Sequence, residues 1–237
     1  MLLLNDPRLI VLKPHKVAGT SLEIALSPFA GRKDIVTFLQ PPEETQRRAL
    51  GVKRGARNHA FRWYELPFVR REEWRRARKR GRLPHRFRPH ITAAELRDLL
   101  PRETWDGFTK LAIVRNPYEV ALSTYYFSRR EGEPFDAFWL RNPHLIGRNR
   151  HYYTIEGANV IDRYLRYEHI LDDLDALERD YPMLAGTRAN FERTRVHSGH
   201  RPPRSEPAEM FARHPQVARL VERQCAFEIE RFGYRLD

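Results

Sequence analysis

The sequence of 237 residues predicts an α/β fold in which a central parallel sheet is flanked by helices. One local pattern, which occurs twice, predicts it. A short apolar run typical of a buried strand is twice followed by a loop and then by a helical segment. Parallel strands need a long crossover, usually a helix, so two strand–loop–helix units favour one parallel sheet. With no internal repeat and no linker, residues 1–237 are expected to form a single domain.

The first unit begins with residues 8–12 (RLIVL), a β-branched apolar run of the kind found in buried strands. The loop KPHKVAGTS occupies residues 13–21. Residues 22–29 (LEIALSPF) have apolar positions at the spacing of one helix face, which predicts a helix packed on the sheet.

Residues 45–88 differ in composition and are interpreted as a basic, Arg-rich insert. Residues 71–82 (REEWRRARKRGR) predict an exposed basic helix ended by Gly81. Aromatic residues are interleaved with the cations: Trp63, Tyr64, Phe68, Trp74 and Phe87. One interpretation of the patch is a site for an acidic sugar chain, with the aromatic rings stacked on sugar rings. For any single residue, the alternative is a solvated helix face with core aromatics.

The second unit starts after a helix predicted over residues 92–100, where Thr92 and Glu95 form a capping box. Residues 110–114 (KLAIV) predict a second buried strand. The turn RNP follows, and residues 118–130 (YEVALSTYYFSRR) predict a helix.

The remaining chain contains one more predicted strand, at residues 162–167 (DRYLRY). Residues 170–180 predict an acidic amphipathic helix. Residues 193–207 (RTRVHSGHRPPRSEP) are typical of a loop, and residues 215–232 predict one further helix.

The charge balance indicates an anionic partner. The formal net charge is +12, and nucleic acid, a phosphorylated cofactor and an acidic polysaccharide all fit it. The single cysteine, Cys225, excludes an intrachain disulfide and a cysteine metal cluster. Residues 5–8 interrupt the apolar start, so no secretory signal is expected, and no run approaches a membrane span. We therefore expect a soluble, cytoplasmic protein with no membrane span.

The loop between the first strand and helix is a candidate phosphate cradle. A helix N-terminus offers unpaired N–H groups and the positive end of a dipole. Ala18 and Gly19 allow close backbone approach, Thr20 and Ser21 supply hydroxyls, and Lys16 supplies a mobile positive charge. The alternative is an ordinary glycine-containing turn. Because the lysine precedes the glycine, the loop differs from the Gly-x4-Gly-Lys-Ser/Thr pattern, which argues against ATP and GTP.

The second candidate anion site is Arg115, which stands at the carboxyl end of the second predicted strand. Open α/β sheets bind ligands at that edge. Ser123 lies about two helical turns later, and an arginine fork with a hydroxyl suits a phosphate. The alternative is an arginine paired to a local carboxylate.

Together the two motifs resemble a known family. HKVAGTSL at residues 15–22 resembles the 5′-phosphosulfate loop, commonly PKTAGTSL, of sulfotransferases that use 3′-phosphoadenosine 5′-phosphosulfate (PAPS). VRNPYEVALSTYYF at 114–127 is similar to that family's 3′-phosphate motif, commonly VRNPYDRLLSAYYF. The segments at 162–177 and 227–234 resemble later family segments. The nearest branch contains the heparan sulfate 2-O-sulfotransferase-like carbohydrate enzymes and their bacterial relatives. The resemblance implies a three-layer, P-loop-like sulfotransferase fold.

The resemblance also implies roles for the first loop. Lys16 is expected to contact the bridging oxygen of PAPS and to stabilise charge on the departing phosphate. The residues expected to hold the 5′-phosphate are Ala18, Gly19, Thr20 and Ser21. The loop departs from the family at His15, where proline is usual, and at Val17, where the usual threonine hydroxyl is lost.

For the rest of the nucleotide, the resemblance implies that Arg115 and Ser123 hold the 3′-phosphate, the group that distinguishes PAPS from ATP. A loop with Arg201 and Arg204 is expected to fold over the nucleotide. The product is 3′-phosphoadenosine 5′-phosphate (PAP).

The acceptor hydroxyl or amine needs a base that titrates near neutral pH, which favours histidine or a carboxylate whose pKa its surroundings raise. His90 resembles the catalytic histidine that precedes the 3′-phosphate motif in the 2-O-sulfotransferase branch, and its alternative is a surface or capping histidine. His59 is the next candidate. The pair His197 and His200 is a poor metal site, and this chemistry needs no metal.

Two rival functions remain: a basic nucleic-acid-binding protein, and a phosphoryl-transferase on a similar scaffold. The first explains the charge of the insert but not the placement of Lys16 and Arg115 at strand–helix junctions. The missing Gly-Lys-Ser/Thr order opposes the second. We expect an acidic or carbohydrate acceptor and no nucleic acid partner, while a lipid-linked saccharide, a small metabolite and the oligomeric state stay open.

Overall fold

The structure is a computed structural model that describes residues 1–79, 83–194 and 206–236. Its centre is a five-stranded sheet with the strand order β3-β1-β2-β4-β7. The strands are β1 (Leu2–Leu4), β2 (Leu9–Leu12), β3 (Ile35–Val36), β4 (Thr109–Val114) and β7 (Arg163–Arg166). A separate hairpin pairs β5 (Thr154–Ile155) with β6 (Ala158–Asn159).

The three strands expected from the sequence are confirmed, and they are parallel. β2 pairs with β4, and β4 pairs with β7. The expectation of a wholly parallel sheet is wrong, because β1 runs antiparallel to both β2 and β3. The connection from β1 to β2 is the short turn at residues 5–8, and a turn of that length joins only antiparallel neighbours.

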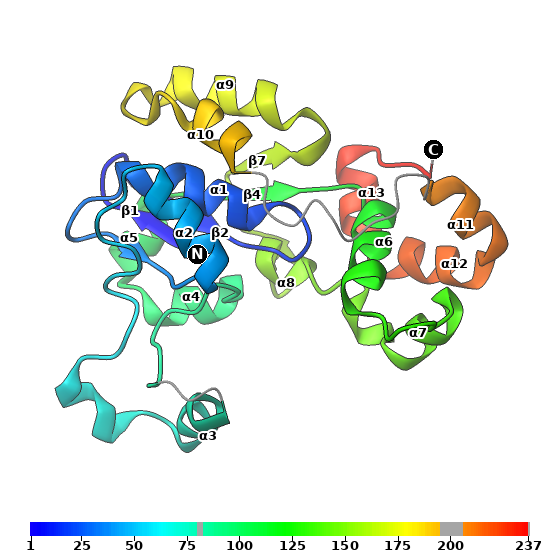
Figure 1. Ribbon diagram of the computed structural model, residues 1–237, viewed down its shortest axis with the longest axis horizontal. Helices are drawn as coiled ribbons and strands as arrows, with labels where there is room; N and C mark the ends of the chain where they lie inside the picture. Colours follow the sequence, from blue (N-terminus) through cyan, green and yellow to red (C-terminus); the bar gives the residue numbers. More distant parts are fainter. Residues whose placement is uncertain (80–82, 195–205, 237) are drawn as a thin grey trace.

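Helices cover both faces of this mixed sheet (Figure 1). Alternate residues of β2 point to opposite faces, so Leu9 and Val11 pack into one apolar cluster while Ile10 and Leu12 pack into another. The first cluster includes residues of α1 (Gly19–Leu26) and α9 (Ile170–Asp180), and α10 (Thr187–Arg193) packs on both helices. The second cluster includes residues of α4 (Ala93–Leu99), α5 (Arg102–Gly107) and α8 (Arg150–Tyr153).

A third, aromatic cluster lies beyond the end of the parallel strands, in the part of Figure 1 that contains α6 and α7. It unites α6 (Pro117–Ser128), α7 (Phe135–Arg141), α11 (Pro207–Arg213) and α12 (Pro215–Gln224). Ring contacts among Tyr125, Phe135 and Phe211 hold these helices together.

The single helix expected over residues 215–232 is two helices, α12 and α13 (Ala226–Phe232), separated at Cys225. Val221 packs into the aromatic cluster, whereas Phe227 packs against the second sheet cluster, the one that contains Ile10 and Leu12. Ile229 of α13 also packs against the aromatic cluster, so α13 contacts both clusters.

The insert forms an arm that projects from the body (Figure 1). The predicted insert, residues 45–88, begins within α2 (Pro41–Ala49), and the arm that follows α2 contains the 3-10 helix η2 (Trp63–Phe68) and the helix α3 (Arg71–Lys79). The expected basic helix is therefore confirmed, although Gly81 lies outside the described residues. Trp63 and Phe68 are 82% and 87% exposed, so these aromatics are not core residues, whereas Phe87 is buried.

The other short 3-10 helices are η1 (Ser27–Phe29), η3 (Pro143–Leu145), η4 (Tyr167–His169) and η5 (Pro182–Leu184). In the described parts of the chain, no helix has the length and apolar character required to cross a membrane.

Candidate active site

The two predicted anion-binding segments meet at the carboxyl edge of the parallel strands. Since β2 and β4 are parallel neighbours, the residues that follow them emerge at the same edge. Arg115 Nη1 donates a hydrogen bond to the Lys16 carbonyl oxygen at 3.2 Å. The structure thus brings together the two residues that the sequence analysis placed at opposite ends of one ligand.

The loop before α1 has an unusual backbone. Lys16 and Ala18 have φ values of 62° and 63°, in the left-handed region that non-glycine residues rarely adopt. Each such residue costs on the order of 1 kcal/mol and tends to be retained at functional sites. Left-handed residues in a turn also orient successive N–H groups into a concave, anion-binding surface.

The N-terminus of α1 continues this surface. The N-cap residue, Ala18, makes no side-chain capping bond, and the first turn contains no acidic residue. The first N–H groups of the helix therefore depend on solvent or a ligand for partners. Thr20 and Ser21 stand in this first turn, with Thr20 half-buried and Ser21 buried. These features fit the predicted cradle.

Lys16 lies over α6, the helix of the second strand–loop–helix unit. Its Nζ is 3.7 Å from the centre of the Phe127 ring. Phe127 is one turn after Ser123, so the ammonium group stands above the face of α6 that carries this half-buried serine. Burial, followed by the charges of Arg115 and Arg148, lowers the pKa of Lys16 to about 8.

Arg115 also has the local carboxylate partner that the alternative reading required. Its Nη2 is 2.9 Å from Glu119 Oε2, and its guanidinium lies 4.2 Å from the centre of the Tyr167 ring. The buried Nε has no hydrogen-bond partner in the described part of the protein. Both terminal nitrogens of the guanidinium therefore have a partner, and N–H groups remain that can donate to an anion.

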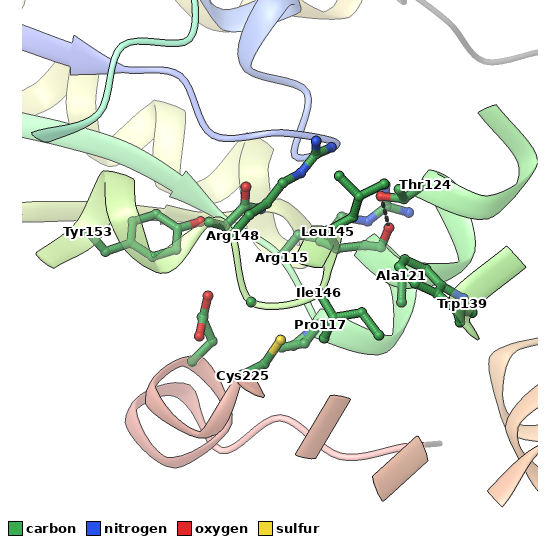
Figure 2. A pocket seen from close by; sticks show the side chains of 14 residues that line it. Arg115, Pro117, Ala121, Thr124, Trp139, Leu145, Ile146, Arg148, Tyr153 and Cys225 are labelled. Carbon is green, nitrogen blue, oxygen red and sulfur yellow. Dashed lines mark hydrogen bonds between the residues drawn. The ribbon is translucent and has the colours of Figure 1, made fainter. Parts of the chain in front are cut away.

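A third wall of the site comes from residues before and within α8, which the sequence analysis did not identify. Arg148 lines a hollow of about 380 Å³, part of it open solvent, together with Arg115. Figure 2 shows the two arginines next to one another, with Cys225 at the opposite end of the hollow. Asn149 is buried, accepts from the backbone N–H of His15 at 2.9 Å, and donates to the His15 carbonyl at 2.9 Å. This double contact fixes the loop before Lys16.

His90 stands beside this loop. Its Nδ1 is 2.8 Å from the Lys13 carbonyl oxygen. A carbonyl only accepts, so Nδ1 carries the proton and Nε2 has the free lone pair of a base. The residue is exposed to solvent, yet desolvation of its ring, followed by the charge of Lys13, lowers its pKa to about 4. His90 is therefore neutral at physiological pH.

His15 lies directly against His90. The two imidazole rings stack at 4.0 Å between centres, and His15 Nε2 is 3.0 Å from the hydroxyl oxygen of Tyr152. Burial, followed by the charges of His90 and Arg148, lowers the pKa of His15 to about 2. The residue that departs from the family pattern is thus a neutral ring packed against the candidate base.

A buried carboxylate holds Lys13 in place. Glu23 on α1 is fully buried and accepts from Lys13 Nζ and Arg47 Nη2, both at 3.1 Å. These cations lower the pKa of the carboxyl to about 2 despite the opposing effect of burial. Glu23 thus anchors the residue whose carbonyl positions His90.

The other candidates do not join this group. The ring of His59 packs against Phe38 and His85, and no contact links it to Lys16 or His90. Arg201 and Arg204, with His197 and His200, lie outside the described residues. Among the described residues, no cluster of His, Cys, Asp and Glu could hold a metal ion.

Comparisons with models of known protein families, with curated protein sequences and with solved structures found no match. The chemistry is therefore inferred from the geometry of this edge. It combines an uncapped helix start, three adjacent cations and a neutral histidine with a free nitrogen. Such a set can bind a polyanion and remove a proton from a group beside it.

Proposed function

We propose that this chain is a PAPS-dependent sulfotransferase with a P-loop-like sulfotransferase fold. The observation that carries the proposal is the contact between Arg115 and the carbonyl of Lys16 at the edge where two parallel strands end. It puts a lysine-bearing phosphate cradle and an arginine within reach of one nucleotide that has phosphates at both ends.

The residues fit this donor. The uncapped start of α1, with Thr20 and Ser21, suits the 5′-phosphate. Lys16 belongs to the loop that precedes α1 and suits the oxygen that bridges phosphorus and sulfur. Arg115 and the half-buried Ser123 remain for the 3′-phosphate, which ATP lacks.

In the proposed reaction, His90 Nε2 takes the proton of the acceptor hydroxyl as that oxygen attacks sulfur. The new oxygen–sulfur bond forms in line with the bond from sulfur to the bridging oxygen, which breaks. The bond's electron pair stays on the bridging oxygen, where Lys16 stabilises it. The products are a sulfate ester and PAP, with the proton on His90.

The arm supplies a surface for the acceptor. Exposed aromatics on η2 and the basic helix α3 lie together on one projection of the molecule (Figure 1). Cations attract a uronic-acid or sulfated saccharide, and exposed rings stack on sugars. An acidic carbohydrate is therefore the acceptor class that we propose.

The test is nucleotide binding measured by calorimetry and thermal shift. We expect PAP to bind and stabilise the protein well above ATP, adenosine 5′-phosphosulfate and duplex DNA at moderate salt. Lys16→Ala should weaken PAP binding at least tenfold without unfolding the chain. His90→Ala should retain PAP binding but lose consumption of PAPS.

Equal responses to PAP, ATP and DNA would reject the proposal and favour a protein that binds nucleic acid through charge alone. A chain that binds PAP but consumes PAPS equally fast without His90 would retain the donor assignment and lose the base.

A further inference from the structure

Two imidazole rings lie face to face beside the loop before α1. The rings of His15 and His90 are 4.0 Å apart between centres and only 12° from parallel. They come from distant parts of the chain, because His15 follows β2 and His90 precedes α4. Each ring limits the orientations that the other can adopt, and one of the two is the candidate base.

The stack supplies a restraint that the hydrogen bond of His90 cannot supply. That bond joins Nδ1 to the Lys13 carbonyl oxygen at 2.8 Å. It holds one atom of the ring but lets the ring turn about the line of the bond, and His90 is exposed to solvent. The parallel ring of His15 opposes this rotation. The direction of Nε2 in His90 therefore depends on where the ring of His15 lies.

His15 is itself held at its backbone and at its ring. Asn149 binds its backbone N–H and carbonyl, both at 2.9 Å. The hydroxyl of Tyr152 shares a hydrogen bond with His15 Nε2 at 3.0 Å, and the two rings meet edge to face. Tyr152 is buried in the same apolar cluster as Ile91, the residue after His90. The ring of His15 is thus fixed from α8.

We propose that Tyr152 and His15 are positioning residues for the base, Tyr152 holding the ring of His15 and His15 holding the ring of His90. This inference rests on the function proposed above. Both residues act through His90, because parallel stacked rings do not hydrogen-bond one another and His15 cannot take the proton from it. Proton transfer requires a nitrogen aligned with the acceptor hydroxyl, so a base whose ring turns freely is a slow one.

The stack also affects the ionisation of His90. The ring of His15 keeps water from one face of the base and contributes to the desolvation that lowers the pKa of His90 to about 4. The charged groups that act on His90 are Lys13, the N-terminal ammonium group and Glu23, and they stay in place when His15 is replaced. Without the His15 ring, the pKa of His90 should rise from about 4 toward its ordinary value of 6.5.

The first experiment measures kcat and KM for PAPS consumption with a uronic-acid oligosaccharide present, at about pH 7.5, where His90 is unprotonated in every variant. His15→Ala should lower kcat about ten- to a hundredfold, the loss expected for a misplaced catalytic group. The accompanying rise in pKa makes His90 more basic, so a lower kcat reports orientation and not base strength. KM and PAP affinity should change less than about twofold, because Asn149 still holds the backbone of the loop.

Two further variants separate the stack from its support. His15→Phe keeps a flat ring and should recover most of kcat. Tyr152→Phe removes only the hydroxyl and should lower kcat about three- to tenfold, the loss of one hydrogen bond. Tyr153→Phe is the matched control, because the hydroxyl it loses donates to the Ile113 carbonyl oxygen at 3.0 Å. It should leave kcat unchanged.

The second experiment follows the imidazole resonances of the free protein by NMR from pH 3 to 8, with His90→Ala as the assignment variant. The midpoint of His90 should rise by at least about one unit in His15→Ala and stay in place in His15→Phe and Tyr153→Phe. This measurement needs no ligand.

Three results would overturn the inference: an unchanged His90 midpoint or kcat in His15→Ala, a loss of PAP affinity as large as the loss of kcat, or a His15→Phe variant as slow as His15→Ala. The second of these would assign His15 to the donor site or to the fold. Failure of the unmodified protein to bind PAP would instead reject the proposed function itself.

Discussion

At the scale of single residues, the site depends on which groups carry a proton. Burial, followed by the charges of Arg115 and Arg148, makes the ammonium group of Lys16 harder to keep charged. His90 is neutral because burial of its ring, followed by the charge of Lys13, lowers its pKa. The same crowding therefore gathers cations for an anion and keeps His90 neutral, with a pKa below the near-neutral value that best suits a general base.

The first prediction concerns Lys16 and pH. Its pKa in the free protein is about 8, so the ammonium is charged below that value and neutral above it. PAP affinity should stay level from pH 7 to 8 and then weaken up to tenfold per pH unit, because binding then requires proton uptake. Calorimetric titration from pH 7 to 10 measures this.

Lys16→Arg provides the control, since an arginine stays protonated throughout this range. Its PAP affinity should show no break near pH 8. An identical break in the variant would assign the titration to another group.

At the scale of elements, the turn from β2 into α1 requires close contact between backbone and side chain. A Cβ at Gly19 would lie 2.8 Å from Lys13 Cγ and 3.6 Å from the Pro14 carbonyl oxygen. The carbonyl of Lys13 positions His90, so this contact links the start of α1 to the base.

We predict that Gly19→Ala destabilises the protein by about 1–3 kcal/mol, the usual cost of overpacking, and weakens PAP binding. Urea unfolding and calorimetry measure the two effects. Gly31→Ala is the control, because its Cβ would meet Asp34 only at 3.6 Å. Normal stability and PAP affinity in Gly19→Ala would contradict the prediction, because they would show that the turn accommodates a Cβ at this position.

Local elements are also where sequence reasoning succeeded most. The capping box of Thr92 and Glu95 forms as expected, and the helix at 170–180 has its predicted bounds. Both depend on neighbours within one or two turns. The break at Cys225 was missed, because contacts with two distant clusters leave no mark in the local pattern of residues 215–232.

At the scale of the whole molecule, donor site and arm are separate features with separable effects. The arm projects away from the body, while the cradle lies at the sheet edge (Figure 1). Removing charge from the arm should therefore weaken binding of an acidic acceptor and leave the donor site intact.

We predict that Arg71→Glu with Arg75→Glu weakens binding of a sulfated uronic-acid oligosaccharide at least tenfold and leaves PAP affinity unchanged. Fluorescence titration of the labelled oligosaccharide measures it.

Trp63→Ser with Phe68→Ser should weaken saccharide binding but spare weak binding to duplex DNA, since only the sugar contact needs the rings. Arg102→Glu with Arg193→Glu reverses two exposed charges elsewhere and serves as the control. An equally large loss of saccharide affinity in this control would show that the effect comes from the overall charge of the protein and not from the arm.

The sequence by itself determined the strand–loop–helix units, the lysine-bearing loop, the arginine at the second strand end and the basic helix of the arm. Each is encoded by neighbouring residues, whose periodicity and capping are visible without a fold. Tertiary structure alone decided that Asn149 holds His15, that Glu23 anchors Lys13, and that Arg148 lines a hollow together with Arg115. It also decided the reversed direction of β1. Contacts such as that between positions 15 and 149 leave no local pattern, because packing of the sheet and its helices creates them.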